Sequence, residues 1–169
     1  MTPAEILEYP DDRLRKQSAP VRDFGAETEA IIELLFDTLY ATSAIALSAP
    51  QINQHQEIFV VDLSEDRTAP QVFINPRIKA KSAWGFVQES CLSIPGVTGS
   101  VLRATQVEMD GQNRHGEPIS RTLSGMEAVC LQHEMDHLVG RLFIDKMSPL
   151  RRWQIKAQAN ARRRSLQSA

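Results

Sequence analysis

The stretch His133-Glu134-Met135-Asp136-His137 determines how the rest of this 169-residue chain is interpreted. In a helix, two histidines four residues apart lie on one face, one turn after another, so both imidazoles can reach a single metal ion. Glu134 stands beside a ligand without being one, where it can take a proton from a water molecule on the metal. The pattern therefore predicts a metal-binding helix.

The flanks of this stretch support the helix. Ser124 and Glu127 have the spacing of a capping box at its start, and Gly140 is a typical stop at its end. The segment between them is apolar on two faces, one shared with the histidines and a second formed by Leu131 and Leu138. A helix that is apolar on more than one side is expected to be buried at the centre of the fold.

A metal site of this kind needs a third protein ligand, and the sequence limits the choice. After His137 the only side chain able to ligate is Asp145, which is too near in sequence to return from a separate helix. The third ligand is therefore expected upstream, where the strong candidates are His55, His115, Cys91 and Cys130. Cys130 lies two helical turns from His137, roughly 10 Å along the axis, too far for one ion to bridge both easily. Cys91 is the best candidate, and the ligand types alone suggest zinc.

Composition indicates one soluble globular domain over residues 1–169. Hydrophobic residues make up 42% and charged residues 24% of the chain, and no apolar run approaches the length of a membrane span. Residues 1–10 carry two glutamates and lack the basic and apolar regions of a signal peptide, so we expect a cytoplasmic protein. The two cysteines, 39 positions apart, could form one disulfide, but in a cytosolic chain with one cysteine near a histidine pair a metal or catalytic role is more common.

Charge is distributed unevenly along the chain. Residues 148–169 hold six basic side chains and no acidic one, a charge of +6, whereas the whole chain has −2 and residues 1–147 therefore carry −8. Such a tail is commonly a solvated helix end, and its functional alternative is a contact with a nucleic acid or another polyanion.

The pattern of elements predicts an α+β fold with mainly antiparallel strands around the central buried metal-binding helix, and with a C-terminal helix around Trp153. A first helix is expected over residues 27–42. The expected strands are 58–61, 72–74 (ended by Asn75-Pro76), 101–109 and 119–123.

Two further stretches give the metal motif a context. Residues 89–96 read Glu-Ser-Cys-Leu-Ser-Ile-Pro-Gly, and residues 44–51 read Ala-Ile-Ala-Leu-Ser-Ala-Pro-Gln. Together with the His-Glu-x-x-His helix, and in this order, they resemble the three signatures of the peptide deformylases, the first of which is Gly-x-Gly-Leu-Ala-Ala-x-Gln. The chain departs from these signatures at four positions: Ala44 and Ala46 replace glycines, Ser48 replaces an alanine, and Ser90 replaces the glycine before the cysteine.

The resemblance implies a role for each matching residue. Cys91, His133 and His137 would bind the metal, which the family implies to be iron(II), with nickel, cobalt or zinc able to substitute. Glu134 would be the general acid/base, and the Gln51 side-chain amide and the Leu92 backbone N–H would face the oxyanion. An apolar pocket for the substrate methionine would be lined by Ile45, Ala46, Val87, Met126, Val129 and Cys130.

The implied substrates are N-formylmethionyl nascent peptides, and the implied partner is the ribosome, approached through the basic C-terminal helix by a cytoplasmic monomer without membrane contact. Two alternatives stay open. One is a diverged deformylase-like protein with weak or altered deacylase activity. The other is a non-catalytic ribosome-associated module that uses the basic tail.

Overall fold

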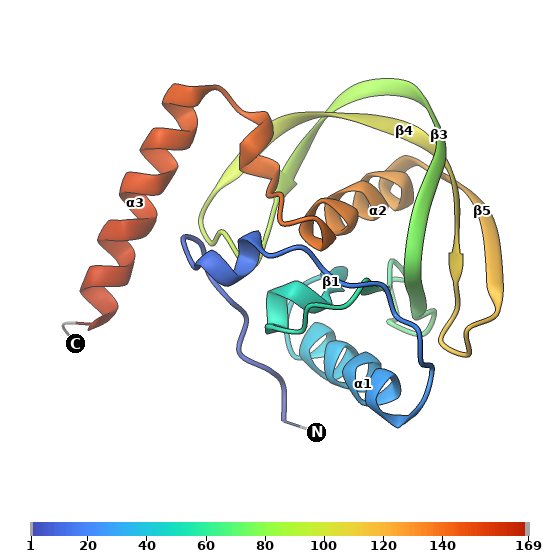
Figure 1. Cartoon of the computed structure of the whole chain (residues 1–169). Coiled ribbons are helices and arrows are strands. Elements are labelled where there is room, and N and C mark those ends of the chain that lie inside the picture. Colours follow the sequence, from blue (N-terminus) through green and yellow to red (C-terminus); the bar gives the residue numbers. More distant parts are fainter. Residues whose placement is uncertain (1, 168–169) are drawn as a thin grey trace.

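The protein, described by a computed structural model over residues 2–167, combines a five-stranded sheet with three α-helices (Figure 1). All neighbouring strands are antiparallel and follow one another in chain order. The strands are β1 (Ala46–Ser48), β2 (Ile58–Val61), β3 (Gln71–Ser90), β4 (Thr98–Gln112) and β5 (Pro118–Ser124). The expected α+β class with antiparallel strands is therefore confirmed.

Helix α2 (Gly125–Leu138) carries the His-Glu-x-x-His stretch and lies under the arch formed by the long strands β3 and β4 (Figure 1). Its Leu131 and Leu138 pack with Phe59, Val107 and Met109 of the sheet in one buried cluster. Burial on this scale is what holds an amphipathic helix in place. The prediction of a central buried helix is confirmed.

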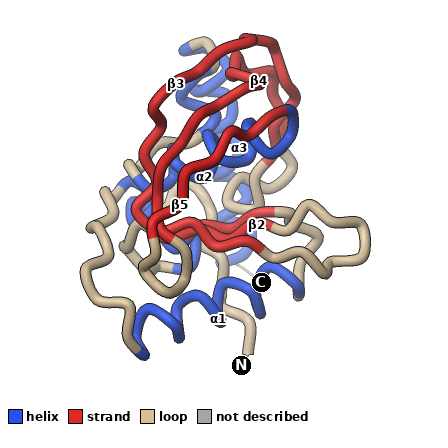
Figure 2. The backbone as a smooth tube through the Cα atoms, turned by 90° about the vertical axis from the view of Figure 1, so that its right-hand side faces the viewer, coloured by secondary structure: helices blue, strands red, loops and turns tan. Residues whose placement is uncertain are grey.

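Helix α1 (Ala26–Tyr40) covers another part of the sheet and begins one residue before the expected range. Its buried residues Ile32, Leu35 and Leu39 pack with Leu47 of β1 and Val60 of β2. Figure 2 shows α1 below the short strand β2, away from the tall ribbon of β3, β4 and β5. This cluster holds β1 firmly at the edge of the sheet, and β1 leads into the 3₁₀ turn Ala49–Ile52 that carries Gln51.

A third cluster joins the N-terminal segment to the C-terminal part of the described chain. Leu7 and the 3₁₀ residue Leu14 pack with Ile94, Phe143 and Ile155. Two short 3₁₀ turns, Asp12–Arg15 and Phe143–Lys146, contribute to this cluster, and helix α3 (Pro149–Gln167) contributes Ile155. Within the described residues, no helix combines the length and the apolar character needed to cross a membrane.

The expected end of the second strand at Asn75-Pro76 is wrong. Asn75 adopts a left-handed conformation (φ 49°), and the ladder with β4 shifts register between Ile74 and Arg77, so the strand bulges and continues to Ser90. Pro76 falls within this break, where its missing N–H removes no ladder hydrogen bond. The extension was missed because Asn75-Pro76 is a typical strand end, although Ile78, Ala80, Trp84 and Phe86 occupy alternate positions in the segment that follows.

The ends of α2 are only partly as expected. Ser124 is the N-cap, but its side chain makes no capping hydrogen bond, and the Glu127 carboxylate instead accepts one from Gln71 Nε2 at 3.4 Å. The predicted capping box is therefore wrong. Gly140 follows the helix with a φ of 68°, and a Cβ there would lie 2.3 Å from the backbone oxygen of Arg15. Only glycine satisfies both conditions, so the helix stop is correct.

Candidate metal centre

Three side chains from two distant parts of the chain meet at the inner face of α2. Cys91 follows directly after β3, and His133 and His137 stand one turn apart on α2. One ligand atom from each of the three lies within 4.8 Å of the others. Cys91 Sγ is 3.3 Å from His137 Nε2, a distance short enough for both to bind one ion. Cys130, buried on the same helix, is not part of this cluster.

The buried carboxylate of Glu89 fixes the tautomer of His133. The two are joined by a hydrogen bond of 2.7 Å between His133 Nδ1 and Glu89 Oε2. Burial raises the pKa of Glu89, but hydrogen bonds from His133 and Arg103 outweigh it and bring the pKa down to about 2. An ionised carboxylate can only accept hydrogen bonds, so Nδ1 carries a proton and Nε2 is the nitrogen that would bind a metal.

A single buried arginine links this carboxylate back to α2. Arg103 donates from Nε and Nη2 to Glu89 at 2.6 and 3.0 Å, and from Nη1 to Asp136 at 2.6 Å. Lys146 adds a longer ion pair of 3.3 Å with Asp136. Arg103 is only 3% exposed, and its guanidinium group donates hydrogen bonds to a carboxylate on each of two sides. The network therefore ties β3, β4 and α2 together around His133.

The second histidine is suited to a metal for a different reason. Burial lowers the pKa of His137 well below its ordinary value, so the imidazole is neutral, as a ligand must be. Its Nδ1 is buried and has no hydrogen-bond partner within residues 2–167. One cysteine sulfur and two imidazole nitrogens form a donor set that fits a borderline-soft divalent cation such as zinc or iron(II).

Glu134 lies beside the cluster and is almost completely buried. Burial raises its pKa, against the lowering effects of His133 and of the Ser48 hydroxyl. One carboxylate oxygen, Oε2, has no hydrogen-bond partner in the described part of the chain. A buried acceptor with an elevated pKa and a free oxygen is what general acid–base chemistry requires.

A cavity of about 750 Å³ opens over these residues. It is lined by Glu134 and His133, by Gln51 and Leu92, and by five of the six residues predicted for the methionine pocket: Ile45, Ala46, Met126, Val129 and Cys130. The sixth, Val87, does not line it, because it sits earlier on β3, half-buried opposite Val101. Burial raises the pKa of Cys130 to about 12, so it is a neutral thiol in this wall.

Met126 is the predicted pocket residue whose setting differs most from expectation. It lines the cavity, yet it is 59% exposed rather than buried with the rest of the helix face. It lies in the first turn of α2, at the open side of the cavity.

Gln51 reaches the centre from the turn that follows β1. Its Nε2 donates to Ser93 Oγ at 3.2 Å and lies 3.5 Å from Cys91 Sγ. The side-chain amide therefore points toward the residue that would hold the metal.

Sequence reasoning assigned no role to Glu89, Arg103 or Asp136. A signal was present for Arg103, which occupies an inward-facing position of β4 between the buried Val101 and Val107. A charged residue on the apolar face of a strand needs a buried partner. The identity of that partner depends on the packing of β3 against β4, which local pattern does not provide.

Comparisons of the sequence and of the structure with known proteins match nearly the whole chain to one family. The family model described as polypeptide deformylase matches residues 3–153. A peptide deformylase of Tolumonas auensis is 44% identical over 156 residues, which cover 92% of this chain and 93% of that protein. The crystal structure of a peptide deformylase from Legionella pneumophila superposes with a TM-score of 0.92 at 37% identity, covering 99% of this chain and 98% of that one. A peptide deformylase of Ehrlichia chaffeensis, in complex with actinonin, gives 0.91 at 27% identity over 96% and 98%.

Proposed function

The chain belongs to the polypeptide deformylase family, and from this premise we propose that it is a metallohydrolase that removes the N-terminal formyl group from formylmethionine of nascent proteins. The observation that carries the proposal is the convergence of Cys91, His133 and His137 beside Glu134 in one cavity. The reaction consumes water and releases formate and a free amino terminus.

The residues of the chain divide the work of this hydrolysis. Cys91, His133 and His137 would hold a divalent cation, which supplies Lewis acidity and an acidified water when bound. Glu134 accepts the proton of the attacking water on its free Oε2 and passes it to the nitrogen of the leaving amine. Its elevated pKa suits both halves of this transfer, since the group must take up a proton and give it back.

The formyl oxygen becomes negatively charged as water adds to the carbon. The Gln51 amide and the Leu92 backbone N–H donate hydrogen bonds to it. Donors of this kind commonly contribute ~3 kcal/mol each to the transition state. The position of Gln51 Nε2 near Cys91 supports this role.

Specificity for methionine follows from the apolar wall of the cavity. Ile45, Val129 and Cys130 offer a surface for an unbranched thioether side chain, and Met126 stands at its open side. A substrate side chain that is one methylene shorter loses about 1–3 kcal/mol of transition-state binding in such a pocket, so formyl-Met peptides are preferred over formyl-Ala peptides.

The bound metal is iron(II), with nickel, cobalt or zinc as functional substitutes. The enzyme acts as a cytoplasmic monomer on peptides that leave the ribosome, and the basic side chains of α3 contact the ribosome. The thiolate and imidazole ligands support a transition metal over magnesium or calcium, which prefer oxygen.

The test is a steady-state assay of formate release from formyl-Met and formyl-Ala tripeptides, with the metal content of the same preparation measured in parallel. We expect metal-dependent turnover and a clear advantage of formyl-Met in kcat/KM. An inactive protein with iron bound would contradict the proposed function, and equal efficiencies would contradict the pocket.

A second candidate, a deacylase with weak or altered preference, is favoured by one observation. Ala44 and Ala46, which stand where the signature has glycines, both line the cavity. A methyl group there can displace the substrate, and a displacement of ~1 Å can cost ~100-fold in rate. Replacing both alanines with glycine is then expected to raise kcat/KM at unchanged metal occupancy, whereas no gain over an already fast parent would exclude this candidate.

A further inference from the structure

Both ends of the Gln51 side-chain amide are held by buried serines. Gln51 Oε1 accepts one hydrogen bond from the backbone N–H of Ser48 at 2.9 Å and a second from the Ser48 hydroxyl at 3.0 Å. Gln51 Nε2 donates to the hydroxyl of Ser93 at 3.2 Å. Ser48 and Ser93 are both 0% exposed and Gln51 is 2% exposed, so protein groups rather than solvent fix the amide.

The backbone N–H of Ser48 determines which way the amide faces, and the Ser48 hydroxyl restrains the same oxygen. A glutamine amide can rotate by half a turn and exchange its oxygen with its nitrogen at almost no change in shape. In the rotated state the NH₂ group would meet the Ser48 backbone N–H, which can only donate, and a buried donor without an acceptor is costly. The Ser48 hydroxyl adds a second hydrogen bond to Gln51 Oε1, so that the NH₂ group is held toward the cavity.

On the premise of the proposed function, we propose that Ser48 is a positioning residue for the reaction, acting through Gln51. Its hydroxyl keeps Gln51 Nε2 aimed at the oxygen on which charge develops. Ser48 does not itself line the cavity. An effect transmitted in this way appears when charge forms, so it changes kcat and leaves KM almost unaltered.

The first experiment is Ser48→Ala, which introduces the alanine that the deformylase signature has at this position. We expect kcat on formyl-Met peptides to fall about fivefold, the rate equivalent of one neutral hydrogen bond, with KM and metal content unchanged. The matched control is Ser18→Ala, since Ser18 is also buried and its hydroxyl has no partner within residues 2–167. A loss in the control equal to the loss in Ser48→Ala would overturn the proposal.

A double-mutant cycle separates positioning from general structure. In a Gln51→Ala background the Ser48→Ala change is expected to have a much smaller effect on kcat, because the group through which Ser48 mainly acts is gone. The remaining effect is the influence of the same hydroxyl on the pKa of Glu134. A further loss of the same size in that background would overturn the proposal.

A third measurement does not depend on turnover. In the zinc-loaded, ¹⁵N-labelled protein, the side-chain NH₂ signals of Gln51 are identified by their loss in Gln51→Ala. We expect these protons to exchange with solvent faster in Ser48→Ala than in the parent, and equal exchange would overturn the anchoring role. A parent without deformylase activity would instead count against the proposed function and leave this measurement valid.

Discussion

Helix α2 lies under the arch of β3 and β4, whereas helix α3 stands beside the body of the molecule (Figure 1). Most side chains of α2 are buried, and its Asp136 and His133 are linked through Arg103 and Glu89. Among residues 149–165 of α3, Ile155 is the one buried side chain. The comparison shows that the chain concentrates its buried polar contacts where a reaction needs fixed geometry.

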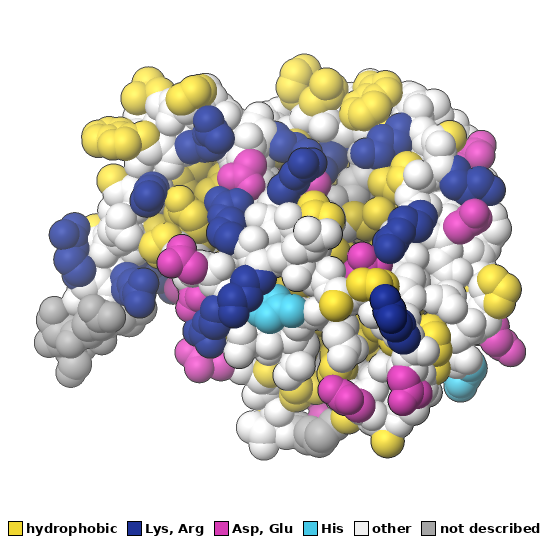
Figure 3. All heavy atoms as spheres, in the orientation of Figure 1, with side chains coloured by type: hydrophobic (Ala, Val, Ile, Leu, Met, Phe, Trp, Pro, Cys, Tyr) yellow, Lys and Arg dark blue, Asp and Glu magenta, His cyan; other side chains and the backbone are white. Residues whose placement is uncertain are grey.

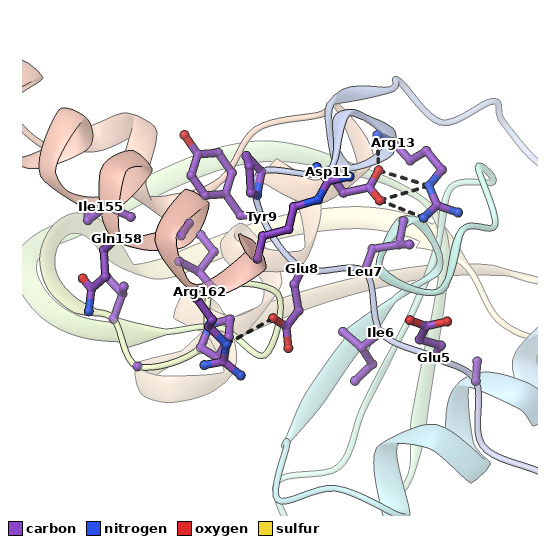
Figure 4. A pocket seen from close by; sticks show the side chains of 18 residues that line it. Glu5, Ile6, Leu7, Glu8, Tyr9, Asp11, Arg13, Ile155, Gln158 and Arg162 are labelled. Carbon is purple, nitrogen blue, oxygen red and sulfur yellow. Dashed lines mark hydrogen bonds and ion pairs between the residues drawn. The ribbon is translucent and has the colours of Figure 1, made fainter. Parts of the chain in front are cut away.

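The attachment of α3 is of a different kind. A groove of about 710 Å³ separates it from the N-terminal segment, and Figure 4 shows Arg162 reaching across to Glu8. That ion pair is 3.6 Å long and about half exposed on both sides. The family model also ends at residue 153, inside α3. Basic side chains are prominent on the visible face of α3 in Figure 3, so this helix presents charge to solvent and contributes only Ile155 to the core among residues 149–165.

The largest expected effect tests the centre itself. Cys91→Ala removes the proposed thiolate ligand, so tightly bound metal and turnover should both be lost. Cys130→Ala is the matched control, because it lines the cavity but lies outside the ligand cluster, and it should keep its metal. Metal analysis after gel filtration measures both. Metal retained by the Cys91 variant and lost by the Cys130 variant would overturn the ligand assignment.

The next prediction compares two ion-pairing arginines: Arg103 of β4, which is paired with Asp136 of α2, and Arg162 of α3. Arg103→Met leaves the buried carboxylate of Glu89 and the half-buried carboxylate of Asp136 without their shared partner, and should lower the free energy of unfolding by about 3–5 kcal/mol. Arg162→Met removes only the exposed pair with Glu8 and should cost less than about 1 kcal/mol. Urea unfolding with excess chelator excludes a contribution from metal binding. Similar losses in the two variants would contradict the contrast between the regions.

The sequence predicted which side chains meet at the candidate metal centre better than it predicted the polar network that surrounds them. His133 and His137 could be found, with Glu134 beside them, because residues four positions apart lie on one face of a helix. Cys91 could be found by exclusion of other ligands and by the resemblance to the family signature. The Glu89–Arg103–Asp136 network could not, because it joins residues up to 47 positions apart through strand pairing. The long second half of β3 was missed for a related reason, since it continues past Asn75-Pro76 through its pairing with β4.

A smaller effect concerns the way α2 is fastened to the sheet. Gln132 is buried, and its side chain both donates to Ala104 O at 2.7 Å and accepts from Ala104 N at 3.2 Å, as a neighbouring strand would. Gln132→Leu leaves these backbone groups unpaired and should cost about 1–3 kcal/mol in the free energy of unfolding. The control Gln158→Leu, at an exposed position of α3, should stay within about 0.5 kcal/mol. Equal unfolding midpoints for the Gln132 variant and the parent would show that the two hydrogen bonds between Gln132 and Ala104 do not contribute to stability.

The smallest effect on catalysis is expected from α3. Deleting residues 160–169, of which 168 and 169 lie outside the described residues, removes three arginines but leaves Ile155 in its cluster. The groove under α3 is separated from the metal centre by the wall around Ile94 and Val97, so kcat/KM on formyl-Met tripeptides should be unchanged. Binding to ribosomes at low salt should weaken, because contacts with phosphate groups depend on positive charge and are screened by salt. Co-sedimentation measures this, with a charge-preserving variant in which Arg162, Arg163 and Arg164 become lysine as the matched control. Undiminished co-sedimentation of the truncated protein would mean that α3 is ordinary solvated surface, and a fall in tripeptide turnover would mean that the two regions are coupled after all.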